Sequence, residues 1–182
     1  MTYPDPTLAK HILIERSTTP APVPPDALAY THLVGERDGT VLHYSQWPDE
    51  GSAAAFARAR PEARAFTLYR SSQISATTTP TGCAVLARAV FDSPDPDRQR
   101  AWMDALLSLE TDDPMPGLLA AHFHLSEDGT EIINYAAWTS REAHRAVMEA
   151  PSTDDDPLAA EWERLYTWPG LIQAEAQRFH PL

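Results

Sequence analysis

Most of the residues that could do chemistry lie in one short stretch of the second half of the chain. Asn134 lies between Ile132 and Ala136 in an apolar segment, and because alternate side chains of a strand share a face, Trp138 lies on that face too. A side-chain amide on an inward strand face needs a partner, which either the core or a ligand supplies. A tryptophan at a strand end either anchors the core or supports an aromatic substrate. The two residues therefore form a candidate site.

Three histidines lie close to this pair in the sequence. His122 and His124 occupy alternate positions of the preceding apolar segment, so they share a strand face. Because imidazole titrates near neutral pH, they are candidates for acid–base work, although a half-buried strand with hydrogen-bonded imidazoles would show the same pattern. His144 follows on a predicted helix, where it either relays protons or faces solvent.

The chain repeats itself. Residues 28–47 and 118–138 align with Leu28 on Leu118, His32 on His122 and the Asp-Gly-Thr of 38–40 on that of 128–130. After a shift of one residue, two aromatic positions also agree, and they pair Tyr44 with Tyr135 and Trp47 with Trp138. Half of 182 residues is 91, which matches the offset, so we predict a tandem duplication of residues 8–76 and 82–182. The alternative is a chance similarity of two hairpins.

The first repeat lacks some of the candidate residues of the second. His43 stands where the second repeat has Asn134, and Val34 stands where it has His124. If the protein has one active pocket, we expect it in the second repeat.

The second repeat has a complete pattern of elements. The Asp-Gly dipeptides predict β-hairpins, residues 83–91 a strand, and residues 97–109 an amphipathic helix. A capping box at 139–142 opens a helix to about Ala150, Asp156-Pro157 opens another, and residues 171–179 close with a strand. This order is the ferredoxin-like, or split βαβ, arrangement. In the first repeat residues 11–16 are a strand, but the following segment has too many prolines for a helix.

One ferredoxin-like sheet leaves a face uncovered, and two repeats can cover each other. We therefore predict an α+β pseudo-dimer whose antiparallel sheets pack face to face, with the helices outside.

Composition excludes several classes of partner. The charge is 14 − 26 = −12, which is unfavourable for nucleic-acid binding. The single cysteine, Cys83, allows no internal disulfide and no multi-thiolate zinc site, and no metal-ligand spacing is present. No stretch approaches 18 apolar residues and the N-terminus does not resemble a signal peptide, so we expect a cytoplasmic protein without a membrane anchor.

Three parts of the second repeat resemble the central motif of antibiotic biosynthesis monooxygenase domains. They are Pro116-Gly117-Leu118, the segment AHFHLSEDGTEIINYAAW and the Thr-Ser-Arg-Glu-Ala that follows it. The resemblance covers residues 82–182 and, in degraded form, the first repeat. It implies the dimeric α+β barrel fold, formed here within one chain, with pairing into a homodimer left open. It also implies oxidation of a polycyclic phenolic substrate to a quinone by O2, with no metal or flavin.

The resemblance also assigns roles to residues. Asn134 and Trp138 match the family's cavity residues, so Asn134 is expected to hydrogen-bond a developing oxyanion and Trp138 to stack on the aromatic substrate. His144 stands where relatives have a tyrosine and is the candidate proton relay, and His124 completes the predicted catalytic set. The predicted substrate-binding residues are His122, Trp47 and His43.

Two alternatives stay open. One is a haem-binding or haem-degrading relative, for which His144 is the candidate axial ligand. The other is a non-catalytic accessory protein that binds a hydrophobic ligand without consuming it.

Overall fold

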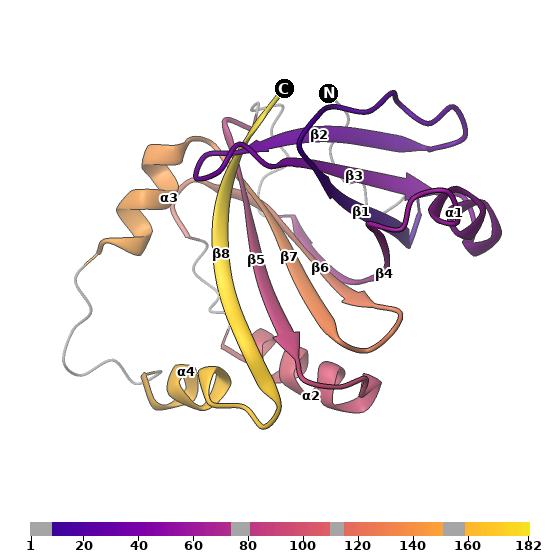
Figure 1. Cartoon of the computed structure of the whole chain (residues 1–182). Coiled ribbons are helices and arrows are strands. Elements are labelled where there is room, and N and C mark those ends of the chain that lie inside the picture. The colour runs from indigo at the N-terminus through magenta and orange to yellow at the C-terminus, as the bar shows by residue number, and fades with distance from the viewer. Residues whose placement is uncertain (1–8, 74–80, 110–114, 151–158) are drawn as a thin grey trace.

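Eight antiparallel strands close into one barrel in the computed structural model, which describes residues 9–73, 81–109, 115–150 and 159–182 (Figure 1). The strands are β1 (His11–Ser17), β2 (Ala29–Gly35), β3 (Val41–Trp47), β4 (Ala63–Gln73), β5 (Cys83–Phe91), β6 (Leu118–Ser126), β7 (Glu131–Trp138) and β8 (Leu171–Pro181). The helices are α1 (Glu50–Ala57), α2 (Pro96–Leu107), α3 (Arg141–Met148) and α4 (Ala159–Tyr166). The order around the barrel is β1-β3-β2-β8-β5-β7-β6-β4.

The two halves of the chain have the same strand order. In each half the last strand borders the first, which borders the third, which borders the second: β4-β1-β3-β2 and β8-β5-β7-β6. This is the order of a ferredoxin-like sheet. The halves join at both edges, because β2 pairs with β8 and β4 pairs with β6. The predicted α+β fold with antiparallel sheets and outer helices is therefore present, and the sheet edges are hydrogen-bonded to each other.

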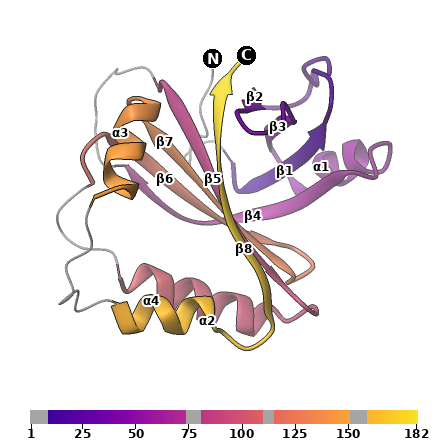
Figure 2. The same ribbon diagram turned by 60° about the vertical axis from the view of Figure 1, so that its left-hand side comes forward.

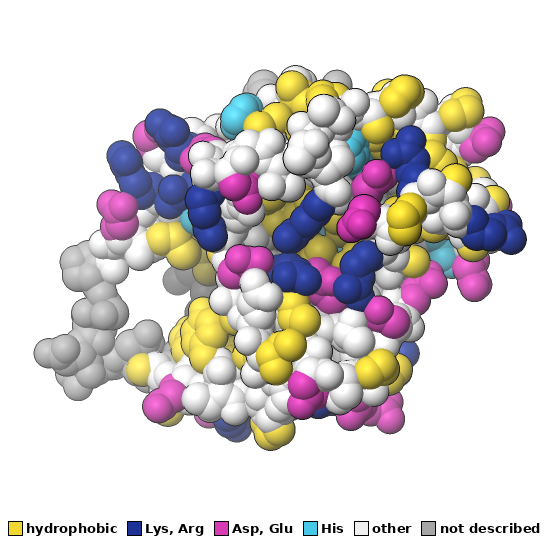
Figure 3. All heavy atoms as spheres, in the orientation of Figure 1, with side chains coloured by type: hydrophobic (Ala, Val, Ile, Leu, Met, Phe, Trp, Pro, Cys, Tyr) yellow, Lys and Arg dark blue, Asp and Glu magenta, His cyan; other side chains and the backbone are white. Residues whose placement is uncertain are grey.

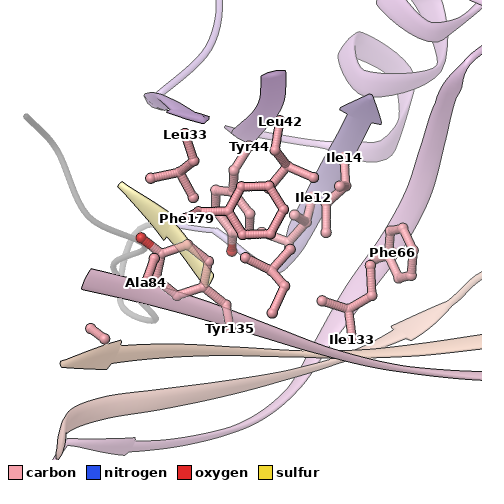
Figure 4. Close-up of a cluster of buried hydrophobic side chains, with 12 residues drawn as sticks. Ile12, Ile14, Leu33, Leu42, Tyr44, Phe66, Ala84, Ile133, Tyr135 and Phe179 are labelled. Carbon is pink, nitrogen blue, oxygen red and sulfur yellow. The ribbon is translucent and has the colours of Figure 1, made fainter. Parts of the chain in front are cut away.

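The barrel interior is one apolar core to which both halves contribute (Figure 4). Alternate residues of each strand point inward, as the period of two requires. Tyr44 and Tyr135 meet near its centre with ring centroids 5.5 Å apart. At one end, the buried carboxylate of Glu131 bridges Arg64 and Arg88. Basic and acidic side chains gather across the middle of the face shown in Figure 3, with hydrophobic surface visible between them.

The helices lie outside the barrel (Figure 2). On the second-half sheet they form two separate hydrophobic clusters. One packs residues of α2 and α4 against Phe123 and Ile132, and the other packs α3 against Val85 and Trp138. Helix α1 covers part of the first-half sheet, where Trp47 lies. No helix among the described residues is long and apolar enough to cross a membrane.

Most of the predicted elements are confirmed with small shifts at their ends. Both hairpins are present, and their turn glycines Gly39 and Gly129 have φ of 68° and 72°, the conformation that favours glycine. Residues 18–28 contain no helix, as the prolines predicted. The N-cap of α3 is Ser140 and not Thr139, the first residue of the predicted capping box, since the Ser140 hydroxyl accepts from the Ala143 N–H at 3.0 Å. The predicted cap at 156–157 lies outside the described residues.

The strand register corrects one part of the repeat alignment. His122 lies opposite Tyr135, and the residue opposite Tyr44 is Thr31, not His32. The offset is therefore 91 on both arms of the hairpin, and the matching Asp-Gly-Thr turns are displaced by one residue. Consequently Leu33, not Val34, occupies the position of His124. Pairing His32 with His122 was wrong, because the two side chains lie on opposite faces of their sheets.

Candidate active site

The predicted site residues divide between the two faces of the second-half sheet. Asn134 and Trp138 point outward, on the face of β7 that packs against the helices. His122 and His124 lie opposite Tyr135 and Ile133, which point into the barrel. The sheet therefore separates the two histidines from the Asn134–Trp138 face, and these four residues do not form a single site.

Asn134 lies at the boundary between the two outer hydrophobic clusters. Its neighbours on adjacent strands are Phe123 on β6 and Ala87 on β5, and Ala87 in turn lies opposite Ala176 on β8. The two alanines leave the sheet open here, because Ala87 is half-buried and Ala176 is exposed. The Oδ1 atom of Asn134 is buried, yet it has no hydrogen-bond partner among the described residues. Such an atom carries an uncompensated desolvation cost that a ligand can offset.

Trp138 of β7 and His144 of α3 pack against each other. The rings meet edge to face with centroids 5.0 Å apart, and both side chains are buried. The indole Nε1 of Trp138 is a second buried polar atom without a hydrogen-bond partner in the described part of the chain. The outward face of β7 thus carries two unpaired polar atoms four residues apart.

The protonation state of His144 follows from its neighbour on β8. The Nε–H group of Arg178 donates to Nδ1 of His144 at 3.0 Å. An arginine only donates, so Nδ1 holds a lone pair and the neutral ring carries its proton on Nε2. Burial, and then the positive charge of Arg178, lower the pKa of His144 below its usual 6.5. The imidazole is therefore neutral at pH 7 and offers an N–H donor.

A cleft of about 370 Å³ opens beside His144. Its walls come from α3, β5 and β8 of the second half and from the loop after β2 of the first half. The lining residues are Glu36, Arg37, Val85, His144, Ala176, Gln177 and Arg178.

His124 is held inside the barrel by two hydrogen bonds. Its Nδ1 donates to the Ile133 carbonyl at 3.2 Å, which leaves Nε2 to accept from the Tyr44 hydroxyl at 2.9 Å. Burial, with a smaller contribution from His122, lowers the pKa of His124 to about 3. His122 is also engaged, through Nδ1 and the Ser71 hydroxyl at 2.8 Å. The geometry favours the structural interpretation of these two histidines.

The first-half candidates lie on the outer face of their own sheet, away from the cleft. His43 bonds the Ser17 hydroxyl and the Tyr30 hydroxyl, each at 2.8 Å. The Trp47 indole donates to Ser45 at 2.9 Å and packs against Phe56 of α1. The structure does not bring these residues to Asn134.

Sequence reasoning missed Arg178, Arg37 and Glu36. Arg178 alternates with alanines along β8, a pattern that marks a half-exposed strand but not its neighbours. Only the register, in which Val85 lies between Ala136 and Arg178, places this guanidinium beside the site. Among the described residues no group of His, Cys, Asp or Glu could hold a metal ion.

Sequence comparison with known proteins finds similarity in the second half of the chain. Residues 85–154 match the family model for antibiotic biosynthesis monooxygenase, a range that contains Asn134, Trp138 and His144. The chain is 41% identical over 58 residues to tetracenomycin-F1 monooxygenase of Streptomyces glaucescens. That alignment covers 31% of this chain and 52% of the relative, so the chain spans about half the length of the curated relative it matches.

Two solved structures are similar in fold. An anthrone oxidase-like protein superposes with a TM-score of 0.67 at 13% identity, over 95% of this chain and 91% of the other. A haem-degrading enzyme from Listeria monocytogenes does so with a TM-score of 0.53 at 14% identity, over 94% and 99%. At these identities the likeness concerns the fold alone. The family match, by contrast, rests on the sequence itself, and the chain carries an antibiotic biosynthesis monooxygenase domain across residues 85–154.

Proposed function

We propose that the protein is a cofactor-independent monooxygenase that oxidises a polycyclic phenolic substrate to a quinone with O2. The observation that carries the proposal is the pair of buried, unpaired polar atoms on the outward face of β7, Asn134 Oδ1 and Trp138 Nε1. Rotation of the Asn134 amide presents either its oxygen or its NH2 group, so it can hydrogen-bond a phenol or the phenolate that forms from it. The sequence similarity to a tetracenomycin-F1 monooxygenase supports an aromatic substrate of this kind.

The proposed reaction begins with ionisation of the phenol. The indole N–H of Trp138 and the Nε2–H of His144 stabilise the phenolate. We assign His144 the role of hydrogen-bond donor rather than base, because Arg178 occupies its lone pair. The phenolic proton leaves to water in the cleft.

The electron-rich anion then reduces O2. One electron passes to O2, the two radicals combine to form a C–O bond, and protonation gives a hydroperoxide. Loss of the C–H proton and cleavage of the O–O bond release water and leave the second carbonyl. In total the phenol and O2 give a quinone and water. The protein's own contribution is to hold the ring, stabilise the anion and limit access of water.

We further propose that the chain is a tandem duplication of residues 8–76 and 82–182 that forms an intrachain pseudo-dimer. The shared strand order, the reciprocal edge pairing and the constant offset of 91 support this origin. The unpaired thiol of Cys83, whose pKa burial raises to about 11, is compatible with the reducing cytoplasm that we propose as the site of action.

Oxygen uptake tests the proposed reaction. Chelator-treated, flavin-free protein is offered anthrone-like and naphthol-like phenols, with heat-denatured protein as the control. We expect uptake above the control, with one quinone formed per O2 consumed. Absence of uptake with every compound would overturn the proposal. A Soret band on titration with hemin would then favour the haem-binding alternative, and binding of the phenols without turnover would favour a ligand carrier.

A further inference from the structure

The cleft beside His144 carries local positive charge in an acidic protein. Arg37 and Arg178 line it, and among the described residues only Glu36 adds a carboxylate to the lining. Glu36 is also 4.0 Å from Arg141 of α3, so its charge is shared with a third cation. With a net charge of −12, the chain as a whole repels anions, whereas positive side chains outnumber negative ones along the lining of this cleft.

Neither lining arginine has an ion-pair partner in the described part of the chain. Arg178 uses its Nε–H for His144, and Arg37 donates one Nη2–H to the Ala176 carbonyl at 3.1 Å. Each guanidinium has five N–H groups, so most of these donors stay available. The bond to His144 holds the Arg178 side chain against α3, and the bond to Ala176 holds the Arg37 side chain against β8, which reduces the entropy that a ligand would have to overcome.

The cleft is connected to the proposed reaction site through the sheet. Ala176 shares a row with Ala87 and Asn134, and neighbouring strands are roughly 5 Å apart, which puts the cleft about 10 Å from Asn134. A fused three-ring or four-ring aromatic system is about this long. A substrate held at Asn134 would therefore extend over Ala87 and place its far end between the two arginines.

We propose that this cleft binds a carboxylate group of the aromatic substrate, which Arg37 and Arg178 hold by charge-assisted hydrogen bonds. The inference rests on the proposed function and deepens it, because it makes the substrate an aromatic acid. A planar carboxylate matches the fork of a guanidinium, and a single negative charge is compatible with Glu36 in the same cleft. Arg37 comes from the first half, so that half supplies part of the second half's site.

Binding of an unreactive quinone tests the inference without turnover. The probes are anthraquinone-2-carboxylate and its neutral methyl ester, with dissociation constants from quenching of tryptophan fluorescence. We expect the acid to bind the unaltered protein about tenfold more tightly than the ester. Arg37→Gln should abolish that preference and leave binding of the ester unchanged.

Two further variants test the sign of the effect. Glu36→Gln removes the lining carboxylate and should strengthen binding of the acid, while the ester should bind as before. Arg100→Gln is the matched control for Arg37→Gln, because it removes the same positive charge from an exposed position on α2. We expect it to change the affinity for neither probe. Equal affinity for the two probes, or an equal loss of both in Arg37→Gln, would overturn the inference.

The outcomes separate this inference from the proposed reaction. A preference for the acid without oxygen uptake would support the binding site and reject the monooxygenase activity. Uptake combined with equal affinity for acid and ester would support the activity and reject the carboxylate site.

Discussion

The outer faces of the two half-sheets carry polar residues at two corresponding positions, and at these positions only the second half leaves polar atoms unpaired. His43 and Trp47 lie 91 residues before Asn134 and Trp138. His43 bonds two hydroxyl groups and Trp47 bonds Ser45, whereas Asn134 Oδ1 and Trp138 Nε1 have no partner in the described residues. At these two positions the first face has internal hydrogen bonds, and the second leaves the polar atoms available. Residue type alone therefore does not mark the site; the state of the hydrogen bonds does.

The largest effect that would sharpen this comparison concerns Asn134 and His43. Asn134→Ala should lower the rate of oxygen uptake about 100-fold to 1000-fold, as expected for loss of a group that stabilises a developing anion. Its unfolding free energy should change by less than about 0.5 kcal/mol, because no hydrogen bond is lost. His43→Ala should do the opposite: it removes a buried imidazole together with its hydrogen bonds to Ser17 and Tyr30, which costs about 1–3 kcal/mol, with unchanged uptake. Urea unfolding and oxygen uptake, measured on the same samples, give the two quantities. A loss of uptake in His43→Ala with a loss of stability in Asn134→Ala would contradict the comparison.

Inside the barrel the comparison is between His124 and its counterpart Leu33. Folding lowers the pKa of His124 from 6.5 to about 3. Below pH 6.5 the unfolded chain therefore binds a proton at this residue that the native state does not bind. Stability from this group is intact above pH 6.5 and falls as the pH drops, by about 2 kcal/mol at pH 5.

The double variant His124→Leu, Tyr44→Phe removes both partners of the bond and should lose that share of the acid sensitivity. Urea unfolding between pH 7 and 5 measures it. His180→Gln, which removes an exposed histidine, should keep the wild-type pH dependence. An equally steep acid loss in the double variant would show that His124 is not its source.

The two tryptophans provide the next test. Trp138→Phe keeps the ring and removes the unpaired N–H, so uptake should fall about tenfold with little change in stability. Trp47→Phe breaks a bond to Ser45 and should cost about 1 kcal/mol without affecting uptake. Steady-state kinetics and thermal unfolding give the two quantities, and equal kinetic losses in both variants would contradict the assignment of the site to the second half.

The smallest effect concerns the pH at which activity is lost. Activity requires neutral His144, whose pKa lies below 6.5 because of burial and then Arg178. Uptake should therefore persist at neutral pH and decline as the pH falls through that value. Arg178→Met removes the second cause of the lowered pKa, so the decline should move to higher pH, while burial continues to lower the pKa. A pH–rate profile measures the shift, and a decline that stays in place would argue against His144 as the titrating group.

Local patterns were sufficient to predict the elements, but not which face each residue uses. The alternation of Ile132, Asn134, Ala136 and Trp138 correctly put them on one face of a strand. Which face of a strand points into the barrel and which packs against the helices depends on contacts across the whole sheet. A short stretch of sequence does not contain these contacts. For the same reason His124 could be predicted as a strand residue, but not as a buried partner of Tyr44, 80 residues away.

The repeat alignment shows a second limit. Aligning the identical Asp-Gly-Thr turns of the two repeats gives an offset that is one residue too short for the first strand of each hairpin. Backbone pairing corrects it, because the hydrogen-bonded ladder, and not the turn, sets which residues face each other. Arg178 was missed since it reaches His144 only through the order of strands around the barrel.

The hydrogen-bonded seams between β2 and β8 and between β4 and β6 have a consequence for how the protein behaves on dilution. Two separate subunits would come apart at low concentration, whereas halves on one chain stay at a fixed, high effective concentration. Covalent linkage also frees the halves from identity, since a substitution in one is not copied into the other. One half can then form internal hydrogen bonds on its own outer face and contribute the loop after β2 to the cleft of the other half. A homodimer of identical subunits cannot encode this asymmetry.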